Sequence, residues 1–80
     1  MPEFIGKVIK KPFGKGSKSE YEAVFLETEH NQYVLRRRGG NPFDDEEMHN
    51  LVGQTIRCTG VVADYVLLIS AWEVLAAGHT

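Results

Sequence analysis

The sequence has 80 residues, of which 42% are hydrophobic and 25% are charged, and its formal net charge is −2. These values are typical of one globular domain, so they exclude a disordered chain and leave no room for a second domain. A single cysteine, Cys58, excludes an internal disulfide, and we expect it to be a small buried hydrophobic residue.

The apolar runs are short throughout the sequence. The N-terminal residues lack the apolar core of a signal peptide. No run approaches the ~20 residues that span a bilayer. We therefore expect a cytoplasmic protein that makes no membrane contact.

The first half of the sequence contains three segments with strand character, rich in β-branched or alternating apolar residues: 4–10, 20–28 and 32–38. Gly6 lies where a bulge or tight bend would let the first strand coil around a barrel. Residues 11–19 contain Pro, Gly and Ser and predict a loop. Residues 29–31 predict the tight turn of a hairpin.

A helix start follows the glycine- and proline-containing residues 39–42. Asp44 is the predicted N-cap, and Glu47 completes a capping box three residues later. Gly53 predicts the C-terminal end. We expect a helix of about two turns, with its inward face formed by Met48, Leu51 and Val52.

Two further strands are predicted after the helix, over residues 54–62 and 65–75, with a tight turn at Ala63 and Asp64. The last strand is almost continuously apolar, which predicts burial on much of both faces. We expect a single domain over residues 1–75 and a flexible tail over 76–80.

The predicted order is strand, strand, strand, helix, strand, strand. This order resembles the OB-fold superfamily, through Gly6, the helix ending in Leu51-Val52-Gly53, and the hairpin from Ile56 to Val74. The expected fold is all-β, a five-stranded OB-type Greek-key barrel with one short helix between strands 3 and 4. The chain also resembles small uncharacterised bacterial OB-like proteins, which implies no activity. An SH3-like barrel is the competing architecture, but it would not take the central helix.

Basic residues are concentrated in the first half of the sequence. Residues 1–38 hold eight of the nine Lys and Arg residues, whereas residues 39–80 hold six acids against Arg57. In a strand, Arg36 and Arg38 face one side and Arg37 the other. These arginines either pair with the acids at 44–47 or form a patch that binds phosphate or carboxylate.

The resemblance implies a ligand face over strands two and three and the first loop. That loop lacks the Walker spacing, so it either touches phosphates non-specifically or is a solvated turn. The candidate nucleic-acid-binding residues are Lys10, Lys11, Phe13, Lys15, Lys18, Tyr21, Tyr33, Arg36 and Arg38. The tyrosines either stack on bases or belong to the core. Phe4, Phe25 and Trp72 are expected in the core.

The expected function is non-catalytic binding, with single-stranded DNA or RNA as one candidate ligand. The alternative is a protein–protein interaction module with an acidic partner. We find no nucleophile with a nearby base and no metal-ligand spacing, so we expect no catalytic residues, no metal site and no cofactor. A small barrel core also leaves little room for a pocket of about 300 Å³. The sequence leaves the oligomeric state open.

Overall fold

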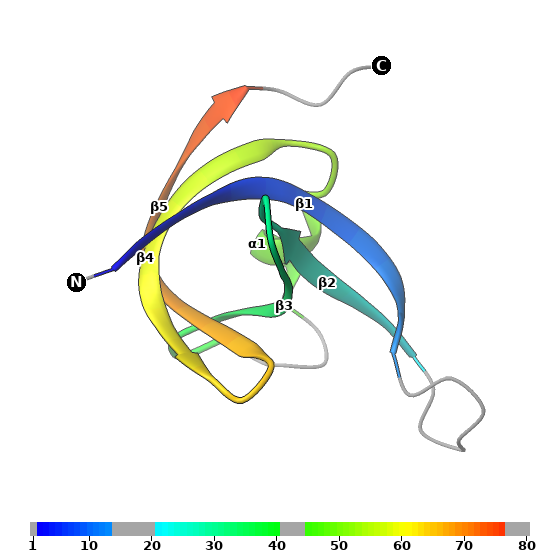
Figure 1. Ribbon diagram of the computed structural model, residues 1–80. Coiled ribbons are helices and arrows are strands. Elements are labelled where there is room, and N and C mark those ends of the chain that lie inside the picture. The colour runs from blue at the N-terminus through cyan, green and yellow to red at the C-terminus, as the bar shows by residue number, and fades with distance from the viewer. Residues whose placement is uncertain (1, 14–20, 41–44, 77–80) are drawn as a thin grey trace.

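The computed structural model describes residues 2–13, 21–40 and 45–76 (Figure 1). In chain order the elements are β1 (Glu3–Phe13), β2 (Tyr21–Glu27), β3 (Gln32–Arg37), α1 (Glu46–His49), β4 (Thr55–Ala63) and β5 (Val66–Ala76). The predicted all-β class and the predicted order of elements are confirmed. β1 is longer than predicted, because residues 11–13 continue the strand instead of beginning a loop.

The five strands form one closed sheet in the order β1-β2-β3-β5-β4. β1 closes one side by pairing with two neighbours, its first half with β4 and its second half with β2, and Lys7 pairs with both. β3 and β5 pair in parallel on the other side, whereas all other pairs are antiparallel. Figure 1 shows the resulting ring of strands, with α1 visible in its middle.

Gly6 allows β1 to approach β2 closely, and no bulge lies at this position. The register shifts lie in the β4–β5 pair, between Thr55 and Ile56 and between Thr59 and Gly60. A Cβ atom on Gly6 would overlap the carbonyl oxygen of Glu27. Glycine therefore lets β1 pass close to the backbone of β2.

The main core fills the inside of the ring. Its buried residues come from all five strands and the α1 region: Val8, Val24, Leu26, Leu35, Met48, Leu51, Ile56, Cys58, Leu67 and Ile69. Phe4, Tyr33, Val52 and Trp72 are partly buried against it. Burial of Cys58, Met48 and Leu51 is as predicted. Each fully buried aliphatic side chain contributes about 1.5–3 kcal/mol to stability.

A second, smaller cluster lies on the outer face of the sheet. Ala23, Phe25 and Val34 are buried there, with Ile9 and Val66 packed beside them. Val24 and Leu26, which alternate with Ala23 and Phe25 along β2, belong to the inner cluster instead. β2 is therefore buried on both faces.

The N-cap of α1 is Asp45, one residue later than predicted. Asp45 has an extended backbone (φ −107°, ψ 98°), and its carboxylate accepts a hydrogen bond from the Glu47 backbone N–H. Asp44 lies outside the described residues. The α-helix proper is four residues long, shorter than the predicted two turns, and the chain leaves the following turn at Gly53 with φ +92°.

Apart from Trp72, which is partly buried, the second half of β5 is exposed, and this contradicts the prediction of burial on much of both faces. Leu67 and Ile69 are fully buried, but Val74 and Leu75 are each 47% exposed. The reason is that β3 pairs with β5 only as far as Ile69, and beyond it β4 is the one described neighbour. In Figure 1 this end of β5 projects from the ring.

The turn before β5 also differs from the prediction by one residue. It occupies Asp64 and Tyr65, and Asp64 has φ +57°. At the other end of the strand, Ala76 still belongs to β5, whereas the rest of the predicted tail, residues 77–80, lies outside the described residues.

Candidate binding cleft

A cleft of about 330 Å³ lies where β2 and β3 separate. The β2–β3 register runs from Glu27–Gln32 to Phe25–Val34 and stops there. The next residues of each strand line the cleft instead of pairing, Glu22 to Val24 on β2 and Leu35 to Arg37 on β3. The expectation that a small barrel core leaves little room for such a pocket is wrong, because the two strands diverge at this point.

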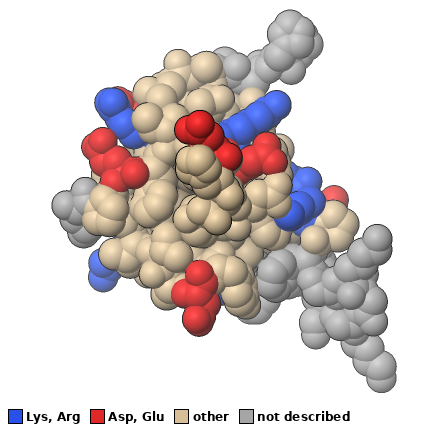
Figure 2. Space-filling view, viewed as in Figure 1, with Lys and Arg blue, Asp and Glu red and all other residues tan. Residues whose placement is uncertain are grey.

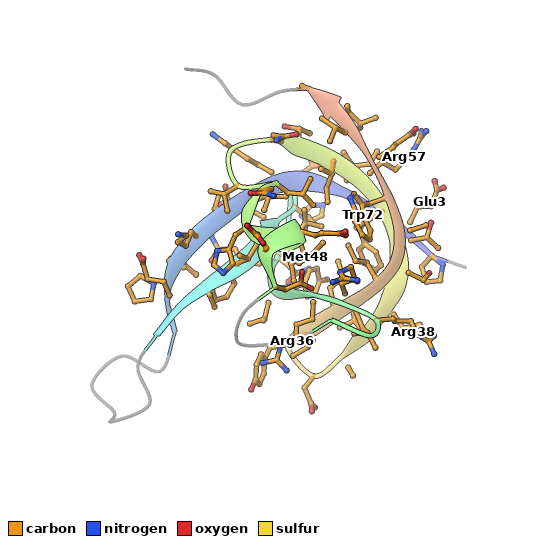
Figure 3. The ribbon with its side chains drawn as sticks, turned by 180° about the vertical axis from the view of Figure 1, so that it is seen from behind. Glu3, Arg36, Arg38, Met48, Arg57 and Trp72 are labelled. Atoms are coloured by element: carbon orange, nitrogen blue, oxygen red, sulfur yellow. The ribbon has the colours of Figure 1, made fainter. Side chains whose placement is uncertain are left out.

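The floor of the cleft is apolar. It is lined by residues from four elements: Ala23, Val24, Val34, Leu35, Met48 and Leu68. In Figure 3 Met48 lies near the middle of the ring, whereas Arg36 and Arg38 lie at its margin. The cleft thus joins an apolar interior to a basic rim, and its volume is at the low end of the roughly 300–1,000 Å³ of small-ligand sites.

Arg37 is the arginine that serves the structure. Its Nε and Nη2 atoms lie 3.1 Å and 3.2 Å from the two carboxylate oxygens of Asp45, and Glu47 is 3.6 Å from Nε. Hydrogen bonding to Asp45, with the charges of Asp45 and Glu47, raises the pKa of Arg37 above its ordinary value. The pair ties the end of β3 to the start of α1 and so fixes one wall of the cleft.

Arg36 and Arg38 make no ion pair with any described residue. The Nε atom of Arg36 is buried and has no hydrogen-bond partner among the described residues, although an unpaired buried donor costs about 1–3 kcal/mol. Both residues line the cleft, and Arg38 is exposed. Of the two alternatives for the arginine run, pairing with the helix acids therefore applies to Arg37 and leaves its neighbours available to an anion.

The two predicted lysines that the structure describes, Lys10 and Lys11, do not line the cleft. Lys10 is exposed near the end of β1. Lys11 lies with its Nζ 4.5 Å from the centre of the Phe25 ring and donates a hydrogen bond to Gln32. Lys15 and Lys18 lie outside the described residues.

Tyr33, the one predicted stacking residue whose side chain the structure describes, does not lie with the arginines. Tyr33 packs against the inner cluster, with its ring 5.8 Å from that of Phe4 in an edge-on arrangement. Phe13 and Tyr21 pair with each other through the β1–β2 backbone, and their side chains lie outside the described part of the chain. Phe25 is buried, as expected of a core residue, but in the outer cluster.

Acidic residues interrupt the basic surface. Glu22 lines the cleft beside the arginines. Glu27 lies further along β2 and accepts a hydrogen bond from Gln32. On the face shown in Figure 2, Lys and Arg alternate with Asp and Glu and no single-sign patch forms.

Sequence reasoning missed several cleft residues, including Glu22, His49 and Leu68. No local motif marks them, because they come from three elements that meet only in the folded chain. For the arginine run the sequence did contain a signal, the alternation along β3. Leu35 and Arg37 point to one face and Arg36 and Arg38 to the other, so one arginine faces inward and two face outward.

Among the described residues, no group of three or more His, Cys, Asp and Glu side chains is arranged to hold a metal ion. No described helix has the length and apolar character needed to cross a membrane. Comparison with protein-family models finds no match. No curated protein and no solved structure is significantly similar to the chain.

Proposed function

We propose that the chain is a non-catalytic binding domain of OB type whose binding site is the cleft between β2 and β3. The strand order, the parallel β3–β5 contact and the position of α1 between β3 and β4 support the OB-type Greek-key assignment. In that architecture the face of strands two and three is a common ligand surface. The cleft opens on those two strands.

The ligand that fits this cleft is an acidic segment of a protein partner that also carries apolar side chains. The observation that carries the proposal is the pair of unpaired guanidiniums of Arg36 and Arg38 beside an apolar floor. A guanidinium binds carboxylate through two parallel hydrogen bonds, and each hydrogen bond to a charged group is worth about 1.5–3 kcal/mol. An apolar side chain on the same segment would fill the floor.

Single-stranded nucleic acid is the second candidate, because the same guanidiniums also bind phosphate. Two features make it the weaker one. A strand of phosphates needs a continuous basic track, but Glu22 lies in the cleft and Glu27 lies on the outer face. Bases also need exposed aromatic platforms at the site. Phe25 is buried, Tyr33 faces the inner cluster, and the exposed Tyr65 does not line the cleft.

Fluorescence anisotropy with two labelled probes tests the proposal. The probes are a peptide of alternating Leu and Glu and an oligothymidylate, each titrated with wild type and with the R36A/R38A double variant. The matched control is Arg57→Ala, since Arg57 is exposed and paired with Glu73 away from the cleft. We expect the peptide to lose at least about tenfold in affinity with the double variant and less than twofold with Arg57→Ala.

Two outcomes would overturn the proposal. Salt-sensitive binding of the oligonucleotide alone, lost in R36A/R38A, would assign the cleft to nucleic acid. Binding of neither probe at high micromolar protein would remove the cleft as a site for either class.

A further inference from the structure

The cleft occupies the place of missing cross-strand pairs. If the β2–β3 register continued past Phe25–Val34, Val24 would face Leu35, Ala23 would face Arg36 and Glu22 would face Arg37. These residues line the cleft, and none of them is paired across it. The same part of β2 remains paired with β1, and the same part of β3 with β5, so each wall is an ordered strand edge.

The backbone of β3 presents peptide groups to this gap. The N–H groups of Val34 and Arg38 donate to the carbonyl oxygens of Tyr65 and Ile69 on the β5 side, at 2.9 Å and 3.0 Å. Alternate residues of a strand direct their peptide groups to opposite neighbours. Leu35 therefore directs its N–H and C=O away from β5. Its N–H lies in the hydrogen-bonded position next to the Phe25–Val34 pair, so the groups that face the cleft beyond that pair are the C=O of Leu35 and the N–H of Arg37.

The two faces of the gap differ in chemistry. On the inner face Val24, Leu35 and Met48 are buried and apolar. On the outer face stands Arg36, whose buried Nε lacks a partner among the described residues, with Arg38 two positions further on. Successive side chains of an extended chain point to opposite faces, so a strand lying here would meet apolar and basic surroundings in turn.

We infer that the partner segment is bound as an added β-strand along the β3 edge at Leu35, with acidic and apolar side chains in alternation. Its acidic side chains meet Arg36 and Arg38, and the apolar ones between them enter the cleft toward Met48. At about 3.3 Å per residue, roughly four residues of the segment follow the separated edge. Backbone pairing supplies affinity and the alternate side chains supply specificity, as in other strand-addition complexes. The inference rests on the proposed function of the same cleft.

Four peptides test the strand geometry separately from the site. The first alternates Leu and Glu, and the second has the same composition with Leu and Glu in separate blocks. The third and fourth are the alternating peptide with every second backbone nitrogen methylated. The methyl groups are on the odd-numbered residues in one peptide and on the even-numbered residues in the other. A single edge uses only one set of N–H groups, so we expect one methylated peptide to bind at least about tenfold more weakly than the other.

We also expect the alternating peptide to bind at least about tenfold more tightly than the block peptide, and the amide proton of Arg37 to become protected from hydrogen exchange. Equal binding by all four peptides, still sensitive to R36A/R38A, would overturn strand addition and leave the acidic-segment site intact. Failure of every peptide to bind would instead reject the site itself.

Discussion

Arg37 and Asp45 form a two-point ion pair that joins the end of β3 to the N-terminus of α1. Asp45 is 9% exposed and also caps α1 through the backbone N–H of Glu47. One carboxylate therefore satisfies a guanidinium and a helix end at the same time. Gly40 packs against this pair, since a Cβ on it would overlap a carboxylate oxygen of Asp45.

Asp45→Ala removes both functions of this carboxylate. We expect a loss of at least about 1–2 kcal/mol in the free energy of unfolding, because the cap alone contributes about 0.5–2 kcal/mol. Asp45→Asn keeps the cap and should lose less. Glu47→Ala is the control, since that side chain is 60% exposed and should change stability by less than about 1 kcal/mol. Urea unfolding of the three variants measures the series, and equal effects of all three would contradict the double role.

Arg36→Met should leave the protein as stable as wild type or more stable by about 1 kcal/mol. The substitution removes a buried donor that has no described partner and keeps the apolar stem. The same variant should lose binding of the alternating Leu–Glu peptide. Thermal unfolding and anisotropy on one sample test both, and a clear destabilisation would show that Arg36 serves the fold instead of the ligand.

Cys58 should react slowly in the native protein. Burial raises the pKa of its thiol from 9.0 to about 11, so at pH 8 the thiolate is roughly 100-fold scarcer than in the unfolded chain. A disulfide reagent should label it at a rate that rises sharply in denaturant. Rapid labelling without denaturant would contradict the buried position.

The raised pKa of Cys58 also gives stability a pH dependence. The folded state holds the thiol proton more tightly, so this contribution is complete below pH 9 and is lost as pH rises toward 11. Cys58→Ala removes it. We expect the difference in unfolding free energy between wild type and Cys58→Ala to shrink over that window, measured in urea at several pH values. A constant difference would contradict the assignment.

Gly60→Ala and Gly39→Ala should destabilise by different mechanisms. At Gly60 a Cβ would overlap the backbone carbonyl oxygen of Leu68, so we expect a loss of about 2–3 kcal/mol. Gly39 has open space but φ +81°, which costs about 1 kcal/mol for alanine. Asparagine tolerates this conformation, so Gly39→Asn should recover part of the loss. Gly60→Asn should not, and recovery at both positions would contradict the distinction.

The strands were predictable because each carries its own periodicity. Alternation in β2 separates Ala23 and Phe25 from Val24 and Leu26, and the structure places the two sets in different clusters. Helix capping was less certain, since Asp44 and Asp45 are adjacent residues with the same capping chemistry. The contact with Arg37, which no local rule contains, accompanies the cap at Asp45.

The cleft was not predictable from periodicity. It exists because β2 and β3 stop pairing at Phe25 and Val34, and the point where two strands diverge depends on their other neighbours, β1 and β5. The exposure of Val74 and Leu75 at the end of β5 has the same origin. An apolar run in the sequence indicates that burial of its side chains would be favourable. Burial occurs only where another element packs beside the strand.

The parallel contact between β3 and β5 has a consequence for folding. It joins Val34 to Val66 and Arg37 to Ile69, across a stretch of chain that contains α1 and all of β4. Forming this contact requires the closure of a long loop, and the entropic cost of closure precedes any stabilising interaction. The contact therefore slows folding. During synthesis, β1, β2 and β3 emerge with Leu26 and Leu35 still exposed to water, and the ring closes only after Ile69 has left the ribosome. A nascent chain halted before that residue should be sensitive to protease, and one extended past it should be resistant.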